Sequence, residues 1–408
     1  ISGGVNYVWV LADRAVDSVD RGRYCDSGYV GGSFCPGRRK HWDSGHVERI
    51  SYQCGDYVSP LESGGKSRMC YKVGMYGGSF NPLHMGHVDC ILQAANLCGK
   101  LYLVLSIGVE RNEINSRIRY RWLYQLTKHI GNVRILTIED QAGTKEAYTR
   151  EFWQADAEQI KSQIGEKIDV VFCGSDYDES SFWNICYPES ELYIFKRNAI
   201  SSTAIRKNPY LHWEWLPDIV KPFYVKKVLL MGGESTGKST LTINLARRFN
   251  TNFVEEAGRE LSEKSGADQM MLSEDFTEIL LQHKLNEMKA LESSNRVLFI
   301  DTDALVTQFY MNFLEDPDIN RNRALSDAVD ALNSYDLILF LEPDVAFVQD
   351  GDRSEVIKAD RKKYSDQIKA LLESHGRTYF CISGDYQERY LTAVREVEKL
   401  FEAEQEEE

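Results

Sequence analysis

The residues best suited to chemistry include a phosphate-binding pattern in the second half of the chain. The stretch GGESTGKST, residues 232–240, has the spacing G-x-x-x-x-G-K-[ST], with an apolar run before it and a helical pattern after it. In such a loop, backbone N–H groups and the start of the helix hold the phosphates of a nucleotide. Lys238 adds a positive charge, and Ser239 supplies an oxygen to Mg²⁺. We therefore predict an ATP site that comprises Gly232, Gly233, Glu234, Ser235, Thr236, Gly237, Ser239 and Thr240.

Charged residues downstream are candidates for the same site. Asp301 and Asp303 follow the apolar run RVLFI. We expect Asp301 to hold the metal and Asp303 to take a proton from an attacking hydroxyl, although either carboxylate would also cap the next helix. Arg353 and Arg361 belong either to a lid over the transferred phosphoryl group or to a solvated helical face. Two further residues, in EEAGRE, are candidates for substrate contact: Glu256 and Arg259.

A second cluster, GGSFNPLHMGH at residues 77–87, combines glycines, a proline and two histidines three positions apart. A zinc site needs further ligands at suitable spacing, and nothing near His84 and His87 supplies a convincing third. The cysteines and histidines of residues 25–54 match no zinc pattern either. Glycines after a strand let the backbone approach a ligand, and the positive end of the following helix favours anions. The two imidazoles are therefore predicted to contact a triphosphate.

The elements that must position these motifs begin at Tyr71. From there, short apolar runs alternate with amphipathic helical patterns, which is typical of α/β proteins with parallel sheets. Buried strands are predicted at residues 71–77, 101–108, from 133, from 169 and at 191–196, and a second series begins at 226–233. Val88, Ile91, Leu92 and Ala95 predict a helix directly after the histidines. We predict two doubly wound domains, residues 69–222 and 223–408, joined by an aromatic segment that packs between them.

Composition excludes several classes of protein. A net charge of −14 is the wrong sign for a protein that binds nucleic acid through its phosphates. No run of about eighteen apolar residues predicts a membrane span, and no signal peptide is recognisable. Nine cysteines without a framework spacing favour free thiols, and hence the cytoplasm. Residues 1–68 form an irregular segment of unknown role, and we expect Met69 to be a natural start.

Two motifs resemble those of the nucleotidylyltransferase superfamily. GGSFNPLHMGH is similar to its G-x-F-x-P-x-H-x-G-H signature, and ISSTAIR, residues 200–206, is similar to its partner motif ISSTxxR. The resemblance implies a Rossmann-like domain in which a substrate phosphate attacks the α-phosphorus of ATP and pyrophosphate leaves. It implies that His84 and His87 contact the ATP phosphates, and that the pyrophosphate is bound by Ser202, Thr203 and Arg206. Further nucleotide contacts are expected from Gly77, Gly78, Ser79, Phe80, Gly174, Asp176, Ser201 and, in the P-loop domain, Arg353.

The order of the two domains narrows the resemblance. A nucleotidylyltransferase followed by a P-loop kinase, with the junction IRKNPYLHWEWLPDIVKPFYVKK, resembles the bacterial bifunctional nicotinamide-mononucleotide (NMN) adenylyltransferase and nicotinamide-riboside kinase of the NadR type. RYRWLYQ is similar to a family segment that brings Arg119 or Arg121 toward a substrate phosphate. Enterobacterial members also carry a helix-turn-helix repressor domain, and residues 1–68 show no such pair of amphipathic helices.

The resemblance implies ATP, Mg²⁺, nicotinamide riboside, NMN and NAD as ligands. One alternative is a pair of coenzyme A enzymes, phosphopantetheine adenylyltransferase and dephospho-coenzyme A kinase, which would combine the same two folds. The other is a nucleotide-sensing regulator, whose expected mark is a basic DNA-binding module. Neither a membrane nor a nucleic acid is expected as a partner, and the sequence leaves open whether the chain forms a homo-oligomer.

Overall fold

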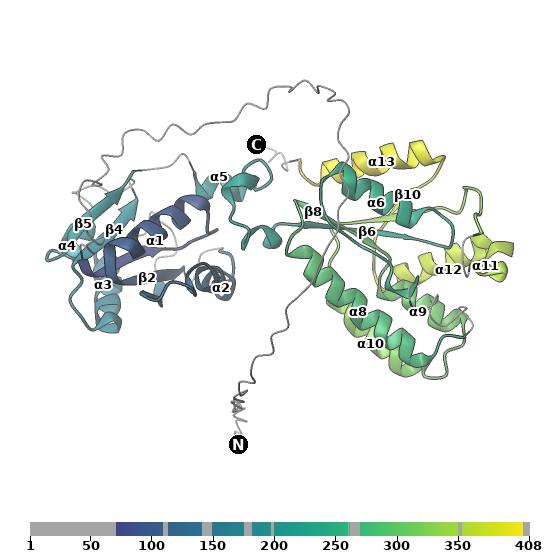
Figure 1. The fold of residues 1–408 in the computed structure, drawn as a ribbon, viewed down its shortest axis with the longest axis horizontal. Coiled ribbons are helices and arrows are strands. Elements are labelled where there is room, and N and C mark those ends of the chain that lie inside the picture. Colours follow the sequence, from purple (N-terminus) through teal and green to yellow (C-terminus); the bar gives the residue numbers. More distant parts are fainter. Residues whose placement is uncertain are drawn as a thin grey trace, which may run out of the picture. The chain divides into compact units, whose positions relative to one another are not determined.

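The computed structural model describes residues 71–108, 113–140, 149–174, 182–196, 200–259, 261, 270–349 and 353–402. Within these residues the chain forms two parallel β-sheets, each covered by helices (Figure 1). The predicted α/β class with two doubly wound sheets is thereby confirmed. The predicted N-terminal segment, residues 1–68, lies outside the described residues, and the predicted domain boundaries remain predictions.

The first sheet has the strand order β3-β2-β1-β4-β5, and all its pairings are parallel. Its strands are β1 (Tyr71–Gly78), β2 (Cys98–Gly108), β3 (Val133–Asp140), β4 (Val170–Gly174) and β5 (Glu191–Phe195). The connecting helices are α1 (Met85–Leu97), α2 (Ser116–Thr127), α3 (Arg150–Ile164) and α4 (Phe182–Cys186), and α5 (Ser202–Lys207) follows β5.

Alternation along the strands explains why helices cover both faces of this sheet. Leu101, Leu103 and Leu105 of β2 pack in one core with apolar residues of α1 and α2. Tyr102 and Val104 point to the other face, where they share a second core with α3 and α4. Successive side chains of a strand point to opposite faces, so a strand buried on both faces reads as a continuous apolar run. LYLVL is such a run.

The second sheet has the strand order β10-β9-β6-β8-β7, again with parallel pairings. Its strands are β6 (Lys226–Gly232), β7 (Phe253–Val254), β8 (Val297–Asp301), β9 (Leu337–Leu341) and β10 (Phe380–Ile382). The helices that frame them are α6 (Lys238–Arg248), α8 (Ser273–Leu291), α9 (Ala304–Phe313), α10 (Ile319–Ala331), α11 (Glu355–Ala359), α12 (Arg361–Ser374) and α13 (Tyr386–Lys399).

The junction between the two sheets is ordered rather than a free linker. It contains two short 3₁₀ turns, Trp213–Trp215 and Lys221–Phe223, and buries Trp213, Leu216 and Val220. The hydroxyl of Tyr210 donates to the Tyr224 carbonyl at 2.9 Å and closes the segment on itself. Its predicted packing between the domains stays a prediction. No helix among the described residues is long and apolar enough to cross a membrane.

Candidate active sites

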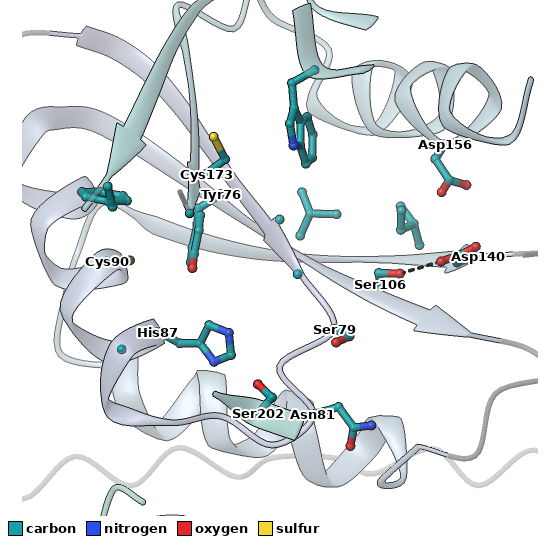
Figure 2. Close-up of a pocket in the computed structure, with 18 of the residues that line it drawn as sticks. Tyr76, Ser79, Asn81, His87, Cys90, Ser106, Asp140, Asp156, Cys173 and Ser202 are labelled. Carbon is teal, nitrogen blue, oxygen red and sulfur yellow. Dashed lines mark hydrogen bonds between the residues drawn. The ribbon is translucent and has the colours of Figure 1, made fainter. Parts of the chain in front are cut away.

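A cavity of about 870 Å³ opens at the carboxyl ends of β1 and β4 in the first domain. The strand order reverses between these two strands, which is where open α/β sheets bind their ligands. Figure 2 shows His87 and Ser202 near one another in this cavity, with Asp140 and Asp156 on another side. The two motifs, more than a hundred residues apart in the sequence, therefore line a single cavity. Its lining includes Gly77, Gly78, Ser79, His84, His87, Gly174, Ser201, Ser202, Thr203 and Arg206.

The histidines stand at the start of α1. His84 is its N-cap residue, and its Nδ1 accepts a hydrogen bond from the His87 backbone N–H at 3.3 Å. The two imidazoles stack with ring centroids 3.7 Å apart, and the edge of Phe80 meets His87 at 5.1 Å. The Nδ1 atom of His87 is buried and has no hydrogen-bond partner among the described residues. A buried polar atom of this kind, beside a cavity and at the positive end of a helix, suits an anionic ligand.

Burial controls the charge of these rings. Desolvation lowers the pKa of His84 to about 4, against the opposing effect of a backbone hydrogen bond. Desolvation, and then the neighbouring His84, lower the pKa of His87 well below its ordinary value. Both rings are therefore neutral at pH 7 in the ligand-free site, because the charged form loses its hydration there. A triphosphate beside the rings would favour their charged form, because a nearby negative charge stabilises it.

Two residues predicted to contact the ligands, Phe80 and Arg119, do not line the cavity. Phe80 does not line the cavity: its ring is 1% exposed, and it packs under His87. Arg119 is also 1% exposed, and its guanidinium bonds to the protein itself, including the Ser79 carbonyl at 2.5 Å. A side chain so buried and so bonded is not available to a substrate phosphate. Arg121, the alternative, is exposed on α2 and does not line the cavity.

The ISSTAIR segment forms the start of α5. Ser201 is the N-cap residue and accepts from the Ala204 N–H at 3.4 Å, as the polar cap pattern predicts. Arg206 donates to the Thr203 hydroxyl at 3.1 Å and to the Asn81 carbonyl at 2.5 Å. Arg206 thereby links the second motif to the loop of the first. Asp176, predicted to lie near the nucleotide, falls outside the described residues.

Sequence reasoning missed an aromatic wall on the far side of the cavity. Trp153 of α3 stacks on Phe182 with centroids 5.8 Å apart and meets Trp183 edge-on at 4.8 Å. All three line the cavity, as do Tyr187 and the carboxylate of Asp156. The aromatic-rich stretch SFWNICY after β4 was the available signal, but nothing in a linear sequence tells a core aromatic from one that faces a ligand.

The P-loop of the second domain has the geometry that its sequence predicts. Gly232 has φ +144°, and a Cβ there would lie 2.7 Å from the Leu341 carbonyl oxygen, so only glycine fits. Gly237, with φ +88°, precedes the first residue of α6. The Lys238 Nζ donates to the Gly233 carbonyl at 3.0 Å, within the loop that would surround a phosphate.

A polar cluster lies beside this loop. Arg259 donates to the Ser239 hydroxyl at 3.1 Å. Burial, followed by the nearby Glu256, raises the pKa of Asp301 to about 6, while Lys238 and a hydrogen bond with Ser239 oppose the shift. The structure therefore brings together five of the predicted side chains: Lys238, Ser239, Glu256, Arg259 and Asp301. The Oδ1 atom of Asp301 is buried and has no hydrogen-bond partner among the described residues.

Asp303 caps the helix that follows it. It is the N-cap residue of α9, and its Oδ1 accepts from the Leu305 N–H at 3.0 Å. Its side chain is 3% exposed, and burial raises its pKa to about 7. The structure thus shows the capping contact that was one alternative for Asp303, and its role as a proton acceptor stays a prediction.

The two arginines of the predicted lid both contact the P-loop. Arg353 donates to the Ser235 hydroxyl at 3.2 Å, and Arg361 donates to the Ser235 carbonyl at 3.1 Å. The carboxylate of Glu234 accepts from the Ser354 N–H at 2.9 Å. The segment around these residues therefore contacts the phosphate loop. A solvated helical face would not require such contacts.

Comparison with known proteins finds two family matches in different parts of the chain. Residues 75–208 match the cytidylyltransferase-like family, and residues 227–389 match the AAA domain family. The trifunctional NAD biosynthesis/regulator protein NadR of Escherichia coli K12 is 30% identical over 345 residues, which cover 81% of this chain and 83% of that protein. The chain belongs to the NadR family. The Salmonella typhimurium NadR protein is 29% identical over the same shares of the two chains.

Solved structures and a second set of relatives refine this assignment. The crystal structure of a NadR protein in complex with NR has a TM-score of 0.67 at 22% identity, and covers 82% of this chain and 97% of that chain. The likeness supports the fold of both domains. The phosphopantetheine adenylyltransferase of Mycoplasma capricolum is 33% identical over 98% of its own length but only 30% of this chain. That match is too short to span the two domains, whereas the NadR matches are long enough to do so.

Proposed function

We propose that this protein makes NAD from nicotinamide riboside in two steps that each use ATP. The second domain phosphorylates the 5′-hydroxyl of the riboside, and the first domain transfers the adenylyl group of ATP to the resulting NMN. The observation that carries the proposal is that one chain of the NadR family contains a cavity lined by His87 and a separate P-loop with Lys238, each suited to phosphate. Solved NadR structures contain NR in one case and NAD with AMP-PNP in another.

The first site suits an in-line displacement on ATP. An oxygen of the NMN phosphate forms a bond to the α-phosphorus, the bond to the β-phosphate oxygen breaks, and pyrophosphate leaves. No covalent enzyme intermediate is needed, so catalysis consists of holding two anions in line and stabilising their charge. The histidines face the triphosphate from the start of α1, and the leaving pyrophosphate is bound from α5 by Ser202, Thr203 and Arg206.

The aromatic wall suits the pyridine ring of NMN. The aromatic side chains of Trp153, Phe182 and Trp183 line the cavity, and Asp156 lines it as well. The pyridinium ring of NMN carries a positive charge, which both an aromatic face and a carboxylate attract. We therefore place the nicotinamide at this wall and the triphosphate at the histidines.

The second site suits phosphoryl transfer with Mg²⁺. The hydroxyl of Ser239 and the carboxylate of Asp301 are oxygen ligands of the kind that Mg²⁺ prefers, and the unpartnered Oδ1 of Asp301 leaves such a ligand available. When bound, the metal ion neutralises charge on the transferring phosphates. Lys238 reaches the same phosphates from the loop, and Arg353 and Arg361 lie against Ser235 on its other side. Glu256 and Arg259 are positioned next to the Ser239 and Asp301 pair.

The test is a product analysis with purified protein, ATP and Mg²⁺. Nicotinamide riboside should yield NMN and ADP, and then NAD and pyrophosphate, each identified by chromatography. Phosphopantetheine is the control substrate, because the first domain also resembles enzymes that use it. Product from phosphopantetheine and none from either pyridine substrate would favour coenzyme A chemistry. Retention of an operator DNA at physiological salt, without turnover, would favour the regulator.

A further inference from the structure

Two buried arginines, one in each domain, occupy the same place in a helix. Arg119 is 1% exposed and Arg389 is 2% exposed. Each is the fourth residue of its helix, α2 or α13. In each case the N-cap residue, Asn115 or Asp385, stands four positions earlier, and the arginine Nε donates at 2.7 Å to the carbonyl of the residue before that cap.

In the first domain the guanidinium connects the phosphate loop to the next strand. The Nη1 of Arg119 donates to the Ser79 carbonyl at 2.5 Å and to the Ser106 carbonyl at 3.1 Å. Ser79 directly follows β1, and Ser106 lies near the carboxyl end of β2, which pairs with β1. The Nη2 forms an ion pair with Glu113 at 2.8 Å.

In the second domain Arg389 makes the same set of bonds. Its Nη1 donates to the Thr236 carbonyl of the P-loop at 2.8 Å, and its Nη2 donates to the Glu342 carbonyl at 2.8 Å. Glu342 directly follows β9, the strand that pairs with β6. An ion pair with Asp344 completes the set. Each arginine thus joins a phosphate loop, the end of the adjacent strand, its own helix start and one carboxylate.

Folding alone gives little reason for a cation at these positions. The first turn of a helix is its positive end, which disfavours a cation, and burying a guanidinium costs its hydration. Glu113 and Asp344 offset both costs. A planar group with five donors can hold several carbonyls at fixed angles at once, which a lysine cannot do.

We propose that Arg119 and Arg389 are positioning residues that set the shape of the two phosphate loops. A trans peptide is planar, so its N–H points away from its carbonyl. Arg119 binds the Ser79 carbonyl, and Arg389 binds the Thr236 carbonyl. The N–H groups of Phe80 and Gly237 belong to the same two peptides, so they point away from the arginines. The two arginines set the loop shape in both domains. Only the activity tests of this role rest on the proposed function.

The test compares Arg119→Lys and Arg389→Lys with Arg117→Lys and Arg395→Lys, which alter exposed arginines of the same helices. Each variant is assayed for both reactions. Misplacing reacting groups by about 1 Å costs about 10²-fold. Arg389→Lys should therefore lower kcat of the kinase reaction by that factor, with KM for ATP within about threefold, and leave adenylyl transfer unchanged. Arg119→Lys should give the reverse, and the controls should change neither.

Arg119→Ala and Arg389→Ala, each with added guanidinium ion, test the same idea by rescue. Guanidinium at millimolar concentration should restore the affected reaction at least tenfold, and methylammonium should not. A rise in KM without a change in kcat, an equal loss of both reactions, or full activity would overturn the inference.

Hydrogen exchange provides a readout that needs no substrate. In Arg119→Lys, amides of residues 77–82 should exchange faster than in the wild type, while those of residues 233–238 should not. In Arg389→Lys the pattern should reverse. Unchanged exchange in both loops would refute the positioning role. A wild-type protein that lacked either reaction would refute the proposed function without affecting this result.

Discussion

Replacement of His87 by alanine is the sharpest test of the first site. Its imidazole lies between the His84 ring, 3.7 Å away, and the Phe80 ring, 5.1 Å away, and its Nδ1 has no hydrogen-bond partner among the described residues. These contacts hold the ring in place and leave Nδ1 available to a ligand. Loss of one preorganised donor in an active site costs about 2.7–4 kcal/mol, or about 10²–10³ in kcat. We expect His87→Ala to lower kcat of adenylyl transfer by that factor.

The assay measures NAD formed from NMN and ATP, alongside ADP formed from nicotinamide riboside and ATP. The kinase reaction serves as an internal control for folding, because the His87 ring belongs to the first domain. His129→Ala, which removes an exposed histidine of that domain, is the matched control and should leave both rates unchanged. An adenylyl rate within threefold of the wild type, or a parallel loss of kinase activity in folded protein, would refute our assignment of the triphosphate site.

Four further predictions concern other parts of the two sites. Lys238→Ala should lower the kinase rate by about 10²-fold or more and leave NAD formation from NMN unchanged. The two rates are measured as ADP release and NAD release. A loss of both reactions would exclude separate sites. Asp301→Asn should raise the Mg²⁺ concentration for half-maximal kinase rate, and an unchanged Mg²⁺ titration would remove this residue from the metal site. Trp183→Leu should raise KM for NMN by about three- to tenfold, because aromatic stacking contributes about 0.5–1.5 kcal/mol; an unchanged KM would place the pyridine elsewhere. The free energy of unfolding should fall as pH drops from about 6.5 toward 4. The pKa of His84 is lowered to about 4 in the folded state, so between these pH values the unfolded chain binds more protons than the folded protein does. The contribution of His84 over this range is about 3 kcal/mol, so the fall should be smaller by about that amount in His84→Gln when unfolding is followed with urea.

The sequence predicted the strands that carry the motifs well, because strands buried on both faces are continuous apolar runs. β1 and β6, which are buried along most of their length, differ by only one residue from the predicted runs 71–77 and 226–233. For the two-residue strand β7, Phe253–Val254, the sequence indicated only that a strand ends before Glu255, because so short a run carries no period. Glycine spacing predicted the P-loop, since Gly232 and Gly237 adopt positive φ values that glycine alone tolerates well.

Side-chain roles were less predictable than elements. Arg119 and Asp303 carry charges that suggested contact with ligands, yet both side chains are buried and bonded within the protein. Charge and position in a motif say nothing about which way a side chain turns. The aromatic wall was missed for the same reason: whether Trp183 faces a cavity or a core depends on the packing of α3 against α4, which local sequence does not determine.

The most direct test of the two-step account follows a single labelled substrate. Purified wild-type protein is given nicotinamide riboside, labelled in its ribose, with ATP and Mg²⁺, and products are separated over time. The account predicts labelled NMN first and labelled NAD afterwards, with one ADP and one pyrophosphate formed for each NAD. Lys238→Ala should form neither product from the riboside but should still convert NMN to NAD. Failure of the wild type to form NAD from either substrate would contradict the account.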